Sequence, residues 1–134
     1  MKIINTPLDG AYIIEQPRHF DDRGYFIESY NKRDFSEVGL DVEFVQDNHS
    51  SSTANVLRGL HYQVEKPQGK LVRCVKGWIT DVIVDLRLTS NTFGEHYKID
   101  LNRPELMLWV PEGFAHGFVV KSDRATVSST TTAY

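Results

Sequence analysis

Hydrophobic and β-branched residues gather in short runs along the chain, and several runs alternate with polar residues at the period of a β-strand. Turn-forming residues separate the runs, as in Lys66-Pro67-Gln68-Gly69. Many short strands joined by such turns indicate an all-β sandwich or barrel, and a jelly roll lies within that class. The runs that predict strands are residues 25–30, 42–46, 55–63, 70–75, 78–87, 96–101, 106–110 and 117–120.

The run 78–87 places alternate side chains on opposite faces of one strand. The face that includes Val82 is the more consistently apolar, and the other face carries Asp81 and Asp85 beside Ile83. An inward carboxylate can orient a histidine ring through its second nitrogen, which is the expectation for Asp81. For Asp85 we expect an ordinary solvated strand face.

One short helix is predicted over residues 31–38, because Asn31 is a suitable N-cap and Gly39 a suitable stop. The segment 128–134 is rich in Ser and Thr, and its β-branched residues fit either a last strand or a frayed tail.

Composition narrows the classes of protein. The chain has 134 residues, of which 40% are hydrophobic and 25% charged, so a single globular domain over 1–134 is expected. The net charge of −3 argues against a general nucleic-acid binder. A single cysteine, Cys74, allows neither an internal disulfide nor a cysteine-based zinc site. With no apolar run long enough for a membrane span and no signal-peptide pattern, we expect a cytoplasmic protein without membrane contact.

Two of the five histidines lie in distinctive surroundings. His116 ends a Pro-x-Gly-x-x-His pattern that resembles the second motif of the cupin superfamily. His61 begins His61-Tyr62-Gln63, where a metal-binding cupin would carry His-x-His, and an amide such as Gln63 is a poor ligand for transition metals. No metal is therefore expected. The simpler interpretation of His61 and His116 is that both are hydrogen-bonded core residues. The nearby cations Arg58 and Lys70 favour instead a site for an anionic ligand.

The segment 20–28, which reads FDDRGYFIE, resembles the first signature of the dTDP-4-dehydrorhamnose 3,5-epimerase family. Further segments resemble that family in the same order along almost the whole chain, and together they are far more specific than any one alone. They are residues 44–50, 56–63, 70–75, 81–87, 92–94 and 110–118.

The resemblance implies a cupin jelly roll and an isomerase without cofactor, acting on a nucleotide-diphospho-4-keto-6-deoxy sugar in deoxysugar biosynthesis. Such a pathway serves a surface polysaccharide, such as the O-antigen of lipopolysaccharide, or a glycosylated metabolite. The resemblance also implies a homodimer whose N-terminal strands reach across to the partner subunit. The nucleobase, thymine or cytosine, is left open.

Carried over position by position, His61 matches the general base and Lys70 a cation beside the enolate. Arg23 and Arg58 match positions that bind the diphosphate. The remaining implied site residues are His116 with Asp81, a second His–Asp pair beside the sugar, and the substrate-binding Phe26, Glu28, Gln46, Asn48 and Tyr134.

The chemistry is consistent with these roles. A 4-keto group acidifies the C–H bonds at C3 and C5, and a neutral histidine can remove such a proton near physiological pH. The charge that develops on the C4 oxygen can be stabilised by a lysine, and guanidinium groups suit phosphate oxygens.

One position departs from the family. Its acid is a tyrosine six residues before a second tyrosine, and with Tyr134 as the second, Ser128 takes the place of the acid. A serine hydroxyl is a far weaker acid than a phenol. The leading hypothesis is therefore an epimerase that inverts C3, and the loss of the tyrosine raises the case that it inverts C3 alone. The alternatives are a full 3,5-epimerase with the acid supplied elsewhere, for example by Tyr134, and a catalytically inactive sugar-nucleotide-binding cupin.

Overall fold

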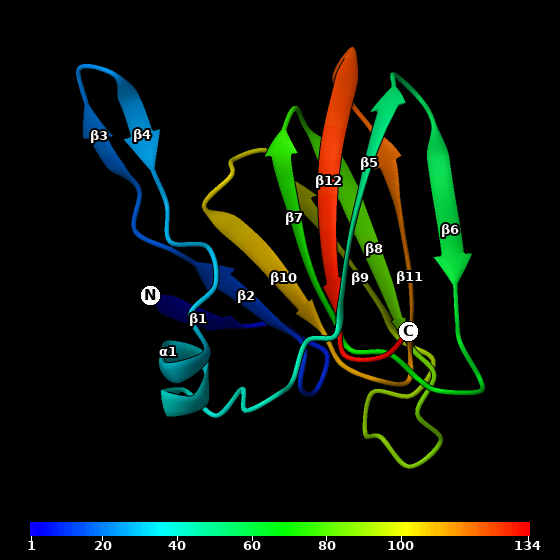
Figure 1. Cartoon of the computed structure of the whole chain (residues 1–134). Coiled ribbons are helices and arrows are strands. Elements are labelled where there is room, and N and C mark those ends of the chain that lie inside the picture. The colour runs from blue at the N-terminus through cyan, green and yellow to red at the C-terminus, as the bar shows by residue number, and fades with distance from the viewer.

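A computed structural model describes the whole chain, residues 1–134, as two facing β-sheets with a protruding hairpin and one short helix, α1 (Lys32–Glu37) (Figure 1). The strands are β1 (Lys2–Asn5), β2 (Tyr12–Glu15), β3 (His19–Asp21), β4 (Gly24–Phe26), β5 (Gln46–Thr53), β6 (Leu57–His61), β7 (Lys70–Lys76), β8 (Ile79–Asp85), β9 (His96–Leu101), β10 (Leu106–Val110), β11 (Phe114–Val120) and β12 (Arg124–Thr131).

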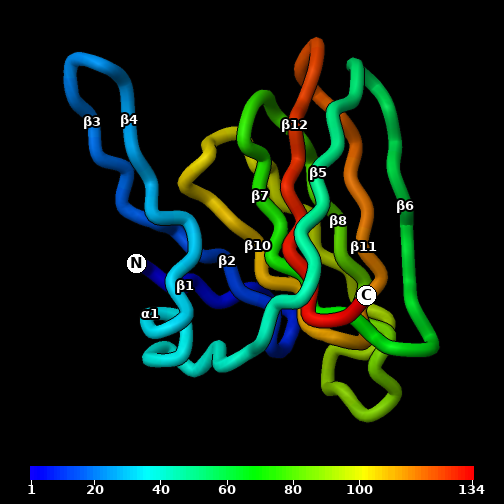
Figure 2. Tube along the Cα trace, in the orientation of Figure 1, coloured from blue at the N-terminus to red at the C-terminus, as the bar shows by residue number.

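The larger sheet has the strand order β1-β2-β10-β7-β12-β5, and the smaller has the order β6-β11-β8-β9. A third, two-stranded sheet is the β3–β4 hairpin. Strands β5 and β12 are distant in sequence but run side by side, as Figure 2 shows. The expected all-β architecture with one short helix is confirmed.

The main core lies between the two facing sheets, because each sheet turns one apolar face inward. The larger sheet contributes Val72 and Cys74 of β7 and Val127 of β12, while the smaller contributes Ile83 of β8 and Phe118 of β11. Since side chains alternate along a strand, these residues identify which positions face the interior.

The helix covers the outer face of the larger sheet. Asn31 caps it by accepting hydrogen bonds from the backbone N–H groups of Arg33 and Asp34, as expected for an N-cap. Phe35 is buried and packs with Met107 and other outer-face residues in a second apolar cluster. No helix in the structure has the length and apolar character needed to cross a membrane.

Several strand expectations need correction. The run 25–30 is a strand only as far as Phe26, and the run 42–46 contributes only Gln46, the first residue of β5. Strands β1 and β2 were not anticipated. The segment 128–134 is resolved in favour of a strand, since β12 extends to Thr131 in the middle of the larger sheet.

The expectation for Asp85 is wrong. Asp85 is 0% exposed and, like Asp81, lies on the inward face of β8. A buried carboxylate requires hydrogen-bond or charge partners, and Asp85 has them in Arg87, Ser90 and Thr92. Those partners come from the loop after β8, so the alternation within the strand did not reveal them.

Candidate active site

A bulge in strand β6 brings Arg58 and His61 to the same face of the smaller sheet. Phe118 of β11 pairs with Arg58 and His116 pairs with His61, so two residues of β6 lie opposite Gly117 alone. Without the bulge, residues three apart on a strand would point to opposite faces. Both Arg58 and His61 therefore point toward the interior side of the sheet.

Gly59 makes this bulge sterically feasible. Its φ of +97° lies in the region that favours glycine, and a Cβ there would lie 2.6 Å from the carbonyl oxygen of His116. Any side chain at this position would push β6 away from β11.

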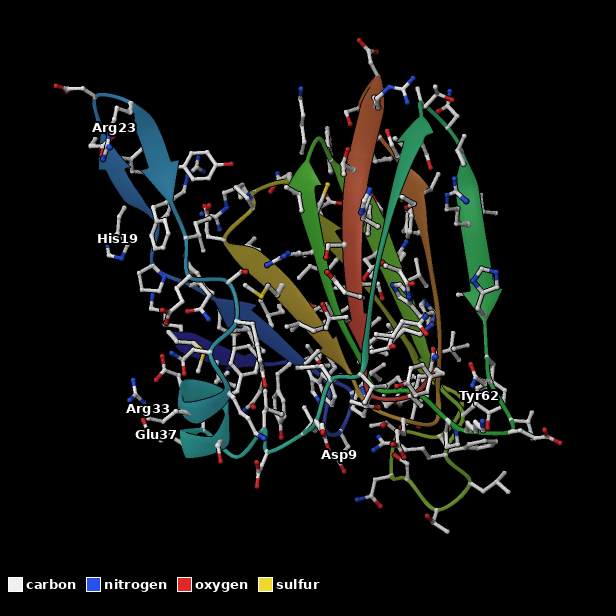
Figure 3. The ribbon with its side chains drawn as sticks, in the orientation of Figure 1. Asp9, His19, Arg23, Arg33, Glu37 and Tyr62 are labelled. Atoms are coloured by element: carbon white, nitrogen blue, oxygen red, sulfur yellow. The ribbon has the colours of Figure 1, made fainter.

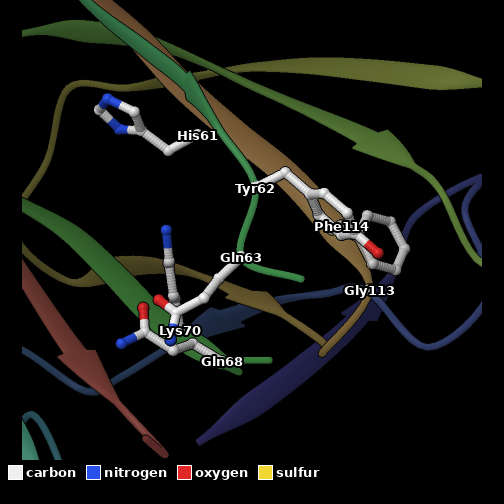
Figure 4. Close-up of a pocket in the computed structure, with 7 residues that line it drawn as sticks. All are labelled: His61, Tyr62, Gln63, Gln68, Lys70, Gly113 and Phe114. Carbon is white, nitrogen blue, oxygen red and sulfur yellow. The ribbon is translucent and has the colours of Figure 1, made fainter. Parts of the chain in front are cut away.

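A cavity of about 290 Å³ opens beside His61, between the end of β6, the start of β7 and the turn before β11. Figure 4 shows Lys70 extended from β7 toward the side of the cavity where His61 lies. The structure thus brings together the two residues expected to act as base and as enolate-stabilising cation. The cavity is lined by His61, Tyr62, Gln63, Gln68, Lys70, Gly113 and Phe114.

His116 and Asp81 form a buried pair behind the cavity. The Nε2 atom of His116 lies 2.7 Å from Oδ1 of Asp81, and Asp81 is 0% exposed. The second carboxylate oxygen, Oδ2, has no hydrogen-bond partner. This contact is the one expected for an inward carboxylate that orients a histidine ring.

Burial and charge act in opposite directions on Lys70. Loss of hydration lowers the pKa of its ammonium group below the ordinary value of 10.5, and the negative charge of Asp81 partly opposes that shift. Cys74 lies on the same face of β7, and burial raises the pKa of its thiol to about 11, which keeps it protonated and unreactive near neutral pH.

The candidate nucleotide-binding residues of β5 lie on the inner face of the larger sheet. Gln46 donates a 3.1 Å hydrogen bond from Nε2 to Oδ1 of Asn48. Arg58 of β6 is held by β5 of the facing sheet, since its Nε donates a 2.8 Å hydrogen bond to Oγ of the buried Ser52. These contacts place the three side chains around the interior that His61 and Lys70 also face.

Ser128 lies on the outer face of the larger sheet, away from the interior that His61 and Lys70 face. The expectation that it takes the place of the acid is therefore wrong. Its Oγ donates to Oδ1 of Asp47 at 3.4 Å, and Thr130 donates to the same oxygen at 2.8 Å. The neighbouring Val127 points into the core between the sheets. The serine of β12 that faces the interior is Ser129, which pairs with Asn48 and Val72.

The three N-terminal candidates lie away from the cavity within one chain. Arg23 and Phe26 belong to the β3–β4 hairpin, where the Arg23 side chain is 90% exposed and pairs with Asp21. Figure 3 shows Arg23 and Tyr62 on opposite sides of the molecule. Glu28 follows the hairpin and accepts a hydrogen bond from Asn31. A single chain therefore does not unite these residues with His61.

Two amide side chains to which the sequence analysis gave no role in the site, Gln63 and Gln68, also line the cavity. Gln68 donates to the carbonyl oxygen of Ala133, and Gln63 donates to that of Tyr134, so both amides fasten the C-terminal segment beside the cavity. The Tyr134 side chain itself is 72% exposed. Polar residues such as Gln63 and Gln68 are common in turns, so the sequence gave no signal that these two hold the C-terminal segment. No three His, Cys, Asp or Glu side chains converge in a group that could hold a metal ion.

Comparison with known proteins adds an independent line of evidence. The family model described as dTDP-4-dehydrorhamnose 3,5-epimerase matches residues 5–134. The dTDP-4-dehydrorhamnose 3,5-epimerase of Methanothermobacter thermautotrophicus is 55% identical over 130 residues, which cover 95% of this chain and 69% of that protein.

Solved structures agree at the level of the fold. The Legionella pneumophila dTDP-6-deoxy-D-glucose-3,5-epimerase, in complex with dTDP-4-keto-L-rhamnose, gives a TM-score of 0.96 at 45% identity, over 99% of this chain and 72% of that one. A 3'-monoepimerase from Streptomyces bikiniensis, in complex with dTDP-quinovose, gives a TM-score of 0.90 at 28% identity. The match covers 98% of this chain and 68% of that one.

The sequence, the fold and the cavity that His61 and Lys70 both line thus agree on one family. The similarity covers nearly the whole chain, and the expected cupin jelly roll and isomerase class are both confirmed. The chain belongs to the dTDP-4-dehydrorhamnose 3,5-epimerase family.

Proposed function

We propose that the protein epimerises a dTDP-4-keto-6-deoxy sugar in deoxysugar biosynthesis, with His61 as the general base. The observation that carries this proposal is that His61 and Lys70, from different strands, line one cavity. A base and a cation on one cavity are what proton abstraction next to a carbonyl group requires.

In the proposed mechanism, neutral His61 removes the proton from the carbon next to the C4 ketone. The C–H electron pair becomes the enolate double bond, and the carbonyl π pair moves onto the C4 oxygen, where the Lys70 ammonium stabilises it. A proton then returns to the same carbon from the opposite face, and the ketone re-forms. The configuration inverts while the sugar's composition is unchanged, so no oxidant or reductant is consumed.

Arg58 and Arg23 supply the diphosphate contacts in this proposal. Arg58 is oriented by Ser52, and its forked guanidinium donors match phosphate oxygens. Gln46 and Asn48 contribute nucleotide contacts from the inner face of β5, and His116 with Asp81 supports the sugar from within the barrel.

We propose inversion at both C3 and C5. The hypothesis of C3 alone rested on a serine in the acid's place, and Ser128 lies outside the cavity. The relative with 55% identity bears the 3,5-epimerase name. Inversion at C3 alone stays as the competing outcome, because Ser129, which faces the interior, is no stronger an acid than Ser128.

The proton donor in this proposal is a phenol at the same end of the barrel. Tyr62 lines the cavity with His61, whereas the Tyr134 side chain is largely exposed. We expect Tyr62→Phe to lower deuterium uptake by about a hundredfold, a typical loss for a general acid, and Tyr134→Phe to lower it less. Parent-like uptake in Tyr62→Phe would exclude Tyr62 as the donor.

The protein acts as a homodimer in this proposal, with the β3–β4 hairpin of each subunit reaching the partner's cavity. The hairpin carries exposed aromatic residues, including Phe20 at 70% and Phe26 at 67%, and it protrudes from the barrel in Figure 1. Exposed aromatic surface of this kind is typical of an interaction site.

The experiment that tests the function is incubation with dTDP- and CDP-4-keto-6-deoxyglucose in deuterated water, followed by NMR. We expect deuterium at C3 and C5 of the dTDP-sugar. Label at C3 alone would identify a monoepimerase, and a faster reaction of the CDP-sugar would reassign the nucleobase. No label, with dTDP binding intact by calorimetry, would identify a binding module and refute the proposal.

A further inference from the structure

We propose that Asp85 and Arg87, which lie outside the cavity, are positioning residues that hold the cavity wall formed by Gly113 and Phe114. This inference rests on the proposed function, because it concerns the placement of the sugar against His61 and Lys70. Neither residue lines the cavity, and both belong to a segment whose match to the family left their role unassigned.

Asp85 is the centre of an unusually complete hydrogen-bond network at the end of β8. Its Oδ1 accepts from the backbone N–H of Arg87 at 3.0 Å and from the Arg87 Nε at 2.9 Å. Its Oδ2 accepts from Arg87 Nη2 at 2.8 Å, and from the hydroxyls of Ser90 and Thr92, each at 2.6 Å. Five donors on one buried carboxylate fix both the loop after β8 and the direction of the Arg87 side chain.

The Arg87 side chain packs directly against the cavity wall from behind. Its guanidinium carbon lies 4.6 Å from the centre of the Phe114 ring, within the range of a cation–π contact. Gly113 fits against the Arg87 stem so closely that a Cβ there would lie 2.5 Å from Cγ of Arg87. The backbone N–H of Leu86 also donates to the carbonyl oxygen of Gly113 at 3.0 Å. Arg87 thus supports Phe114 and Gly113, two residues of the cavity wall, from outside the cavity.

The network also joins the turn between β1 and β2 to the same wall. Arg87 Nη2 donates to the backbone carbonyl of Asp9 at 2.5 Å, and the Asp9 N–H lies 3.4 Å from Thr92 Oγ1. Figure 3 marks Asp9 on that turn, at the end of the molecule where Tyr62 also lies. The loop after β8 thus bonds directly to the Asp85 carboxylate, and Arg87 connects it to the β1–β2 turn and to Gly113.

Such a wall matters because proton transfer depends on placement. A misplacement of about 1 Å at a reacting group can cost about a hundredfold in rate, even when the substituted residue is remote. Phe114 pairs with Asp85 in the β8–β11 ladder, two residues before the pairing of His116 with Ile83. A shift of the wall would therefore move the sugar relative to His61 without removing any group that binds the nucleotide.

The test compares the parent with Arg87→Ala, Arg87→Lys, Phe114→Leu and the double variant Arg87→Ala/Phe114→Leu. We expect Arg87→Ala to lower kcat at least about tenfold while the calorimetric affinity for dTDP stays within about threefold. The Arg87→Lys variant should recover part of kcat. The double variant should be no slower than Phe114→Leu, because residues that act through one another are not additive.

Arg124→Ala is the matched control, since Arg124 also donates to a serine, Ser51, but lies at the far end of β12 from the C-terminal segment beside the cavity. Its kcat should equal that of the parent. An unchanged kcat in Arg87→Ala, or losses that multiply in the double variant, would overturn the positioning role. If Arg87→Ala does not fold, Arg87→Lys and its combination with Phe114→Leu provide the same comparison.

A crystal structure of the Arg87 variant supplies a readout independent of turnover. We expect a displaced Phe114 ring and a displaced turn at Gly113; an unmoved wall would refute the inference. A parent protein that labels no sugar would refute the proposed function itself, so the two failures are distinguishable.

Discussion

At the scale of single residues, the proposed mechanism depends on the charge balance around Lys70. Lys70 is partly buried, which lowers the pKa of its ammonium group, and only Asp81 opposes that shift. In the proposed mechanism the enolate needs a cation, so we expect activity to fall as Lys70 loses its proton. The alkaline limit of the reaction therefore reports the protonation of Lys70.

We expect Asp81→Asn to move the alkaline limit of deuterium uptake to lower pH. The substitution removes the negative charge that raises the pKa of Lys70, so the proton is lost earlier as the pH rises. The measurement is the pH profile of uptake relative to its own maximum. Asp100→Asn, at a surface acid that accepts from Thr80, is the control and should not move the limit. A limit that stays in place or rises in Asp81→Asn contradicts this account.

Asp85 makes a prediction about stability. Hydrogen bonds from Arg87, and then from Ser90 and Thr92, hold the pKa of this carboxyl below its ordinary value of 3.8. A depressed pKa in the folded state stabilises the fold fully above the unfolded-state pKa, and that contribution is lost as the pH falls toward the folded-state pKa. Asp85→Asn should cost about 3 kcal/mol at pH 7, as expected for breaking a buried ion pair.

The cost of Asp85→Asn should stay constant from pH 7 to about pH 5 and shrink below about pH 4. Urea unfolding of parent and variant at each pH measures it. A difference that stays constant or grows toward pH 2 would show that the carboxylate charge is not what stabilises the loop.

At the scale of elements, the sequence predicted which segments carry the chemistry better than which way their side chains point. The strand around His61 and the one short helix follow from local patterns. The bulge that aligns Arg58 with His61 does not, since it depends on the close approach of β11. The prediction for Ser128 was wrong for a related reason. An alignment error of one residue along a strand moves the predicted side chain to the opposite face of the sheet.

The bulge in β6 can be tested through Gly59. Gly59→Ala introduces a Cβ 2.6 Å from the carbonyl oxygen of His116, so β6 must shift and carry His61 with it. Gly39 has a similar φ of +89° but open space around it, so Gly39→Ala shares the backbone strain of about 1–2 kcal/mol without the clash. We expect Gly59→Ala to lose deuterium uptake by at least about tenfold and Gly39→Ala to keep it. Equal uptake in the two folded variants would mean that the bulge does not place His61.

At the scale of the whole molecule, one chain holds only part of the proposed site. Arg23 and Phe26 belong to the β3–β4 hairpin, which lies at the opposite side of the molecule from β6 in Figure 1. His61, at the end of β6, lines the cavity together with Lys70. In a twofold dimer, each hairpin can complete the partner's cavity. The sequence indicated both sets of residues through family resemblance, but no local pattern assigns them to different subunits.

Mixing two inactive variants tests this division. If Arg23 acts in the partner's cavity, a heterodimer of His61→Ala and Arg23→Ala contains one intact site, and random subunit exchange should restore about a quarter of the parent activity. The two variants are refolded together from denaturant, and each is also refolded alone as the control. Activity no greater than the sum of the separate variants would place Arg23 and His61 in the same subunit's site, or Arg23 in none.

Deuterium incorporation by His61→Ala and His61→Asn tests the central claim most directly. Each variant is incubated with the dTDP-sugar that the parent accepts, in deuterated water, while calorimetry follows dTDP binding. We predict uptake reduced by about a hundred- to ten-thousand-fold with dTDP affinity essentially retained, because the base is lost and the nucleotide contacts remain. Parent-like uptake in both variants would contradict the role of His61 and the mechanism built on it.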